Sequence, residues 1–204
     1  MSKERLKIAI EQLGNNTIET SLAVINDLEQ IAQNYPQYHW IIMDILATFV
    51  RENAPYIPQE KVTNNLSTKV RIDIQAALTV IARRDVSKDP KNEQLDLSHT
   101  NIRGANLNKA NLEQTNLYQA NLAGANLREA NLAGAILSAA NLEGTNLYLA
   151  NLEGAILSAA SLKGANLEAA NLHCASLYLA RLHGAVLNDA ILDGANLREA
   201  KFFE

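Results

Sequence analysis

A leucine recurs at every fifth position in the second half of the chain, and this period most constrains the fold. From residue 95 to residue 204 the chain divides into 22 units of five, and only Ile102 and Phe202 replace the leucine. Alanine stands two positions before the leucine in 18 units, and asparagine stands between them in 13. The unit is therefore Ala-Asn-Leu-x-x, where x varies.

This period excludes both a regular helix and a continuous strand. Five residues of an α-helix advance by about 500°, so leucines at this spacing would lie on every side of the helix. In a strand, an odd period would send successive leucines to opposite faces. A short extended segment followed by a corner fits, with Ala and Leu facing an axis and Asn facing water. We therefore expect replacement of Asn141 by Asp to have little effect and replacement of Leu142 by Asp to break the stack.

Two longer periods predict how the corners close. The segment AILSAA at residues 135–140 returns at residues 155–160, twenty positions later. Glycine fills the last slot of many alternate units, which predicts two alternating types of corner and an even number of sides. Four sides of five residues satisfy both periods, so each residue should lie over the residue twenty positions before it.

Residues 95–204 resemble the pentapeptide-repeat family, whose A(D/N)LXX units wind into a right-handed quadrilateral parallel β-helix. The resemblance implies the right hand, and 22 consecutive units make about 5.5 coils of this solenoid. The preceding segment, above all HWIIMDILATFVRENAP, resembles the helical segment found before such arrays in many members. The family is especially abundant in cyanobacteria. We therefore expect a mainly β solenoid that follows an all-α helical module.

Residues 1–86 should form this N-terminal module, with about four helices. Apolar residues recur at helical spacing, and Thr17 is a candidate N-cap of the second helix. The predicted helices span residues 3–13, 18–33, 36–54 and 70–84. Residues 87–94 should be a linker and residues 95–204 the β-helix.

The first coil of a solenoid needs a cover, because it would otherwise expose open backbone groups and a layer of leucines. The helical module precedes this coil directly. We therefore expect the module to cap the β-helix around Leu95, Leu97 and Ile102.

Charge and composition argue against several classes of function. The formal net charge is −4, and the array has 7 basic against 10 acidic residues, whereas strong nucleic-acid binders present a basic face. No apolar run approaches the roughly 18 residues of a membrane span. The single cysteine, Cys174, cannot form an internal disulfide, which predicts the cytoplasm as the location. We expect no membrane partner and no nucleic acid.

The sequence contains no motif for catalysis, so we expect no enzyme, no cofactor and no metal. His173 and Cys174 come nearest to a ligand set, but His183 lies ten residues later and thus on the opposite side of a twenty-residue coil. Inward Ala and Leu side chains should fill the axis and leave no pocket. In the module, the pair His39 and Trp40 is interpreted as packed helix residues. The run Arg83-Arg84-Asp85 is interpreted as a solvated helix end.

A protein-interaction scaffold is the preferred function, with flat outer faces of the rod as the binding surface and an unknown protein as the partner. The alternative is a DNA mimic, in which the chain would resemble those pentapeptide-repeat members that imitate duplex DNA and bind gyrase. Such a mimic needs rows of negative charge. Here the slot before Leu is acidic only at Asp96.

Two surfaces are candidate interaction sites. The first is a strip of apolar residues on one face, in contrast to the polar side that carries Glu113 and Glu153, which should stay solvated. The alternative is that its isoleucines only stiffen the wall. The second is the last repeat, where two copies could meet as a homodimer or the chain could fray. The strip comprises Ile136, Ile156, Tyr178 and Leu179, and the C-terminal association edge comprises Phe202 and Phe203.

Overall fold

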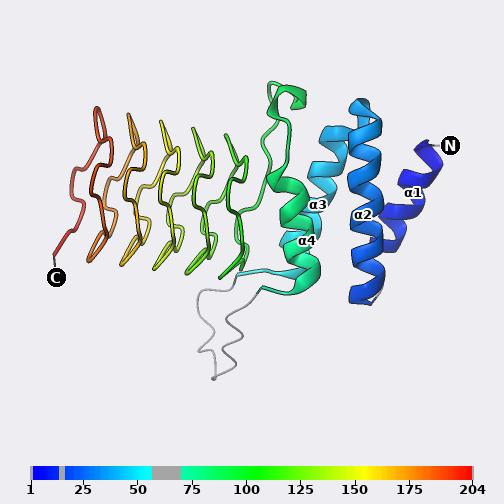
Figure 1. Ribbon diagram of the computed structural model, residues 1–204, viewed down its shortest axis with the longest axis horizontal. Helices are drawn as coiled ribbons and strands as arrows, with labels where there is room; N and C mark the ends of the chain where they lie inside the picture. Colours follow the sequence, from blue (N-terminus) through cyan, green and yellow to red (C-terminus); the bar gives the residue numbers. More distant parts are fainter. Residues whose placement is uncertain (1, 14–16, 57–69, 204) are drawn as a thin grey trace.

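The computed structural model describes residues 2–13, 17–56 and 70–203, which form an elongated molecule with helices at one end and a coiled array at the other (Figure 1). Helix α1 lies farthest from the array, α2 follows, and α3 and α4 lie nearest to it. The elements are α1 (Ser2–Leu13), α2 (Ile18–Asn34), η1 (Pro36–Tyr38), α3 (His39–Asn53), α4 (Ile72–Ala82) and η2 (Val86–Lys88). Of the helices in these ranges, none is long and apolar enough to cross a membrane.

The four predicted helices are present in the described residues, with small shifts of their ends. Thr17 caps α2 as expected, because its Oγ1 accepts a hydrogen bond from the Thr20 N–H at 3.3 Å. The third helix starts with the 3-10 turn η1, where Pro36 fixes the first turn, and then continues as α3. The predicted breaks at 14–16 and at Pro58 lie outside the described residues.

Parallel β-bridges connect each coil of the array to the next. Every bridge inside the array joins residues twenty positions apart, for example Asn101 to Asn121 and Asn121 to Asn141. Twenty residues are four units of five, so the predicted coil length and its four sides are confirmed. Its right-handed sense stays a prediction. We number the faces by their first bridged residue: face one begins at Asp96, face two at Asn101, face three at Asn106 and face four at Asn111.

The corners between faces share one conformation. At each corner from residue 105 onward, the N–H in the Ala slot donates to the carbonyl of the leucine-slot residue three positions before, as Ala110 does to Leu107 at 3.0 Å. The last slot has a positive φ of 53° to 70° at every corner from His99 to Glu199, in 8 glycines and 13 other residues. The prediction of two corner types is therefore wrong. A Cβ added at Gly144 would meet nothing within 4 Å, so glycine serves to avoid the left-handed strain of about 1 kcal/mol.

Inward leucines and alanines fill the axis of the array and form one continuous core with the helices. In the interior coils these side chains are 0 to 2% exposed, as predicted. Burial of each leucine stabilises the fold by about 1.5 to 3 kcal/mol.

Many of the outward asparagines form ladders, which corrects the expectation that they only face water. Asn141 shows the pattern: its Oδ1 accepts from the Glu143 N–H at 3.1 Å, and its Nδ2 donates to Asn121 Oδ1 at 3.1 Å. Asn121 itself is only 7% exposed. The side chain thus closes the local turn and also connects neighbouring coils.

Candidate interaction site

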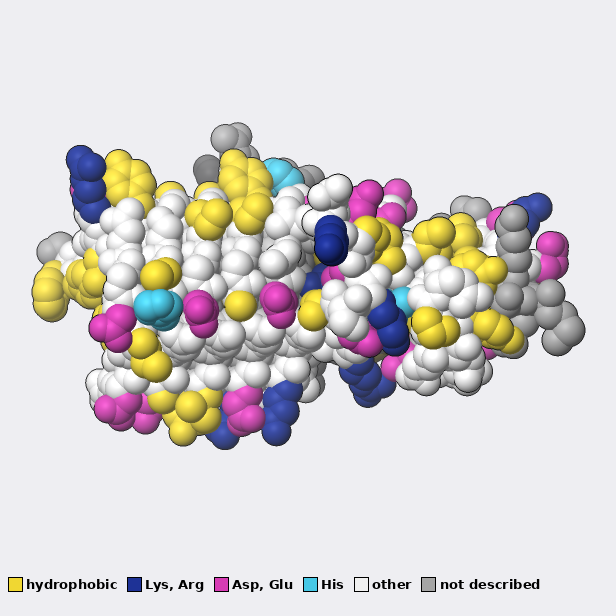
Figure 2. All heavy atoms as spheres, turned by 90° about the horizontal axis from the view of Figure 1, so that it is seen from above, with side chains coloured by type: hydrophobic (Ala, Val, Ile, Leu, Met, Phe, Trp, Pro, Cys, Tyr) yellow, Lys and Arg dark blue, Asp and Glu magenta, His cyan; other side chains and the backbone are white. Residues whose placement is uncertain are grey.

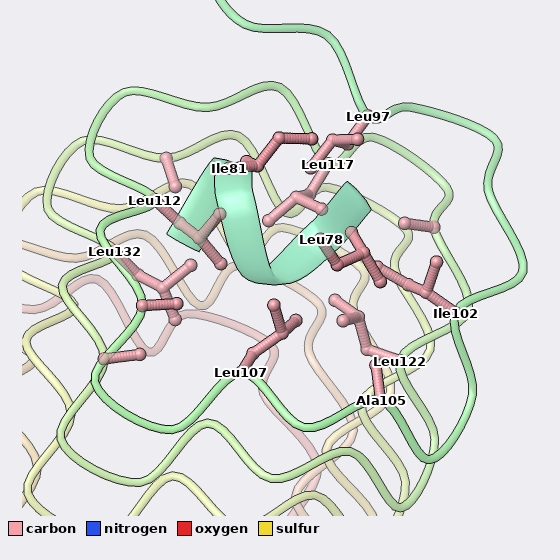
Figure 3. Close-up of a cluster of buried hydrophobic side chains, with 14 of the residues drawn as sticks. Leu78, Ile81, Leu97, Ile102, Ala105, Leu107, Leu112, Leu117, Leu122 and Leu132 are labelled. Carbon is pink, nitrogen blue, oxygen red and sulfur yellow. The ribbon is translucent and has the colours of Figure 1, made fainter. Parts of the chain in front are cut away.

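Helix α4 lies across the open end of the first coil (Figure 3). Leu78 and Ile81 of α4 point toward the leucine-slot residues of this coil and are fully buried with them. Leu97 and Ile102 are 0% exposed and Leu107 is 1% exposed, the same values as in the interior coils. An apolar helix face therefore occupies the place that a preceding coil would take.

The backbone N–H groups of the first coil also find partners in the helical module. In the interior, each outward residue donates to a carbonyl 21 positions earlier, as Asn126 does to Ala105 at 2.9 Å. A helix leaves its last four carbonyls unpaired, and two of the partners here lie at the ends of α3 and α4. The bonds run from Asn101 to the carbonyl of Ala54 (2.6 Å), from Asn111 to the carbonyl of Ala82 (2.8 Å) and from Asn106 to Oε1 of Gln75 (2.8 Å).

Gln75 replaces a strand neighbour with its side chain. Its Oε1 accepts from the Asn106 N–H, and its Nε2 donates to the Asn106 carbonyl at 2.9 Å. Both bonds have the pattern of a parallel ladder, and the amide provides them because the backbone of α4 is already paired within the helix. Sequence reasoning missed Gln75, since nothing in the local sequence distinguishes it from a solvated helix residue.

Arg84 is buried, not solvated as predicted. It is 4% exposed, donates from Nη2 to the Glu113 carbonyl, and pairs through Nε with Asp89 Oδ2 at 3.3 Å. Burial lowers the pKa of Arg84 and raises the pKa of Asp89. The guanidinium nevertheless stays charged, because its ordinary pKa is far above neutrality. Arg84 thus attaches the segment after α4 to the edge of face four.

A pocket of about 500 Å³ lies beside this ion pair, between the predicted linker and the first coil. The expectation of a filled axis holds, but the expectation that the chain has no pocket is wrong. The charged residues of the lining are Arg84 and Lys91 against Asp89, Glu93 and Glu113. Because acidic groups outnumber basic ones, the pocket has no excess positive charge with which to hold an anion.

Three of the histidines and the cysteine lie at separate places in the fold or only contact each other. His39 is buried and its Nε2 accepts the Asp85 N–H at 3.2 Å, while burial and then the nearby Lys88 lower its pKa. His173 contacts Cys174 across 3.3 Å on face four. His183 belongs to face two, on the opposite side as predicted. In the parts of the chain that the structure describes, no group of three or more His, Cys, Asp or Glu could hold a metal ion.

The predicted strip lies on face one. Ile136 is bridged to Ile156, which is bridged in turn to Ser176 beside Tyr178 and Leu179. Ile156 is 41% exposed and Leu179 is 38% exposed, whereas Ile136 and Tyr178 are half-buried. The array surface seen in Figure 2 is largely uncharged, with separate hydrophobic groups on it. The four residues are therefore neighbours on one flat wall.

Small residues lie between two tyrosines within the strip, and we call this stretch the trough. Along face one, Ser138 and Ser158 occupy the slot that Tyr118 fills on one side and Tyr178 on the other. The two tyrosines are three coils apart, or about 14 Å at the strand spacing of a sheet. Tyr118 is 39% exposed, so an aromatic ring borders the trough at this end.

A notch of about 270 Å³ adjoins the trough at the corner between faces one and two. Ala139 and Ala159 form its small corner residues, and Glu143, Ser161 and Arg181 are among its polar lining residues. The Ser161 hydroxyl donates to Glu143 at 2.8 Å. Arg181 is exposed and has no ion-pair partner within the described ranges. The sequence pattern contained Arg181 as a deviation from Asn, but its position beside the strip was not predicted.

The polar side of the array and its C-terminal edge were also the subject of expectations, and the polar side differs from them in part. Glu113 is half-buried and accepts from Asn131 Nδ2 at 3.1 Å, so it is not freely solvated, whereas Glu153 is exposed. At the other end of the array, Phe202 is half-buried and Phe203 is 89% exposed. Association of two chains through this edge stays a prediction.

The repeat pattern matches that of a known family. The family described as Pentapeptide repeats (8 copies) matches residues 96–134, 135–173 and 180–204. These segments cover half of the chain, and the chain therefore belongs to the pentapeptide-repeat family. Among curated proteins, no significant match is found.

Solved structures similar to this chain include pentapeptide-repeat proteins from cyanobacteria. HetL from Nostoc sp. strain PCC 7120, involved in heterocyst differentiation regulation, is 34% identical over 52% of this chain and 63% of its own, with a TM-score of 0.30. Rfr23 from Cyanothece 51142 is 34% identical over 55% of this chain and 67% of its own, also with a TM-score of 0.30. QnrB1, a plasmid-mediated fluoroquinolone resistance protein, is 20% identical over 53% and 58%, with a TM-score of 0.45.

Proposed function

We propose that this right-handed quadrilateral rod is a non-enzymatic scaffold of the cytoplasm that binds a partner protein through face one. The observation that carries the proposal is the apolar strip of Ile136, Ile156, Tyr178 and Leu179 on face one, in an array whose outward slot holds asparagine in 13 of 22 units. Backbone bonds hold each interior coil on both sides, so little conformational entropy is lost when a partner binds. The trough and its tyrosine border offer the aromatic and small-residue contacts that interfaces use.

The alternative, DNA mimicry, has less support from the arrangement of charges. Asp96 is the one acidic residue in the outward slot before Leu. Its carboxylate accepts from the Ser98 N–H at 2.9 Å and from Asn116 Nδ2 at 3.0 Å, and it lies 3.5 Å from Arg51. A carboxylate that is bonded in this way does not reproduce a row of phosphates.

The test restores the repeat consensus on face one by the double substitution Ile136→Asn and Ile156→Asn. Because asparagine is the commonest residue in this slot, the fold should be preserved. The matched control is Val186→Asn with Ile191→Asn, which changes apolar residues of the same slot on faces three and four that are at least as exposed as Ile136 and Ile156. Partners are captured from the source cell with each variant and quantified by mass spectrometry.

We expect the face-one variant to lose at least one partner that the wild type and the control variant both retain. Any self-association measured by sedimentation is compared in the same way. If the face-one variant captures every partner of the wild type equally, including a second copy of the chain, the isoleucines only stiffen the wall and the proposal fails.

A further inference from the structure

A second surface, far from face one, lies in the helical module. A groove of about 200 Å³ runs between α1 and α3. Ile10 and Leu13 of α1 form one wall, while Ile45, Thr48 and Phe49 of α3 belong to the other. Leu13 and Phe49 are buried at the base of these walls, whereas Ile10 is 44% exposed. Figure 2 shows hydrophobic side chains gathered on the exposed surface of the module.

The groove arises because α1 and α3 both contact α2 and leave a channel between them. On α3, the outward side repeats at helical spacing through Ile41, Asp44, Ile45, Thr48 and Glu52. Ile41, at the start of this side, is 49% exposed. Ile41 and Ile45 are thus the apolar residues of this side, and Asp44, Thr48 and Glu52 are its polar residues.

The charged residues of the groove lining are both acidic. Asp44 and Glu52 are exposed on α3, and neither has a hydrogen bond or an ion pair in the described part of the chain. They are eight residues apart, which is about 12 Å along a helix. Arg51, the only Lys or Arg of α3, bonds to Asp96 of the array instead. Among the described residues, two negative charges therefore lie along an apolar groove without a partner.

We propose that this groove binds an amphipathic helix of a partner protein, with its apolar face toward Ile10 and Ile45 and two basic residues two turns apart toward Asp44 and Glu52. A channel between two helices accepts a third helix at the usual spacing of 8 to 10 Å. Binding of an apolar helix face in such a groove is a common mode of recognition. Acidic rims select basic flanks and oppose anionic lipid, so the occupant is a protein helix and not a membrane surface.

The experiment uses the full chain and a synthetic peptide of about 18 residues, long enough to form a helix. The peptide has leucines on one face and two lysines seven residues apart beside them. A second peptide replaces both lysines by glutamate. Affinity is measured by fluorescence anisotropy at low and high salt, and methyl NMR follows Ile10 and Ile45.

The variant Asp44→Asn with Glu52→Gln removes the rim charges without change of shape. The control variant Glu93→Gln with Asp193→Asn removes the same net charge at exposed positions away from the groove. Both variants should melt like the wild type, because all four side chains are exposed.

We expect the lysine peptide to bind the wild type and the control equally and the rim variant about tenfold more weakly, since two surface charge pairs are lost. High salt should reduce this difference, and the methyl signals of Ile10 and Ile45 should shift. The proposal is overturned if the lysine peptide does not bind the wild type, if the glutamate peptide binds as well, or if the rim variant binds unchanged. Because face one is intact in every variant, these outcomes are independent of the proposed scaffold function.

Discussion

The first and last coils of the array have the same repeat but different surroundings. In the first coil, Leu97 and Ile102 are fully buried under α4. In the last coil, Leu187, Leu192 and Leu197 occupy the same slot and are half-exposed. The repeat alone therefore orients its leucines inward at both ends, but only a covering element buries them.

The difference also shows how a helix can cover a β-helix. A helix has few free backbone groups, so it matches a row of strand N–H groups only through its last carbonyls and its side chains. The chain uses both means, with Ala54 and Ala82 at helix ends and Gln75 within α4. We infer that these bonds, together with the apolar face of α4, replace a coil that would otherwise precede residue 95.

Removal of residues 1–86 should have the largest effect on this comparison, because it makes the first coil resemble the last. Leu97, Ile102 and Leu107 lose their cover, and each contributes about 1.5 to 3 kcal/mol. We expect the truncated array to self-associate through its open edge and to melt at a lower temperature. Sedimentation and thermal unfolding measure both effects. A truncated array that stays monomeric and equally heat-resistant would show that the module is not a cap.

A buried charge should distinguish interior from end coils. Leu142→Asp places a carboxylate in the closed axis, where we expect a loss of more than about 4 kcal/mol or no folding. Leu192→Asp, in the same slot of the last coil, can reach water and should cost clearly less. Urea unfolding of the two variants compares them. Equal losses would mean that the last coil is as closed as the interior.

The Gln75 side chain should account for part of the cap by itself. Gln75→Ala removes two hydrogen bonds to Asn106 and should cost about 2 kcal/mol. Gln75→Glu retains the acceptor but faces the Asn106 carbonyl with an oxygen, so it should not restore the wild-type stability. Gln33→Ala, at an exposed site on α2, is the control and should change stability by less than about 0.5 kcal/mol. Equal urea midpoints for Gln75→Ala and Gln33→Ala would contradict the role of Gln75.

Loss of a single bond in an asparagine ladder should have the smallest effect on stability. The ladders lie in the interior coils, with which the first and last coils are compared. Asn141→Asp keeps the bond from Glu143 N–H but loses the donor to Asn121, so we expect a loss of about 1 kcal/mol. Asn146→Asp is the control, because Nδ2 of Asn146 has no partner among the described residues. Identical thermal midpoints of the two variants would mean that the ladder bonds do not contribute.

The period of five predicted much of the array, because one geometric rule applies to every unit. Together with the return of AILSAA after twenty residues, it predicted the twenty-residue coil, the inward leucines and the shared face of Ile136 and Ile156. The asparagine ladder had a signal that was not used, since Asn101, Asn121 and Asn141 repeat at the coil length. The roles of Gln75 and Arg84 had no such signal. Their partners in the array are about 30 positions away in the chain, and only the tertiary fold brings them together.

Hydrogen exchange of single backbone amides in the intact protein tests the cap most directly. The N–H groups of Asn101, Asn106 and Asn111 have acceptors in the module, whereas those of Leu187, Leu192 and Leu197 have none among the described residues. We predict that the first set exchanges as slowly as Asn126 in the interior and that the second set exchanges much faster. If the first-coil amides exchange as fast as those of the last coil, the helical module does not replace a coil, and the account is wrong.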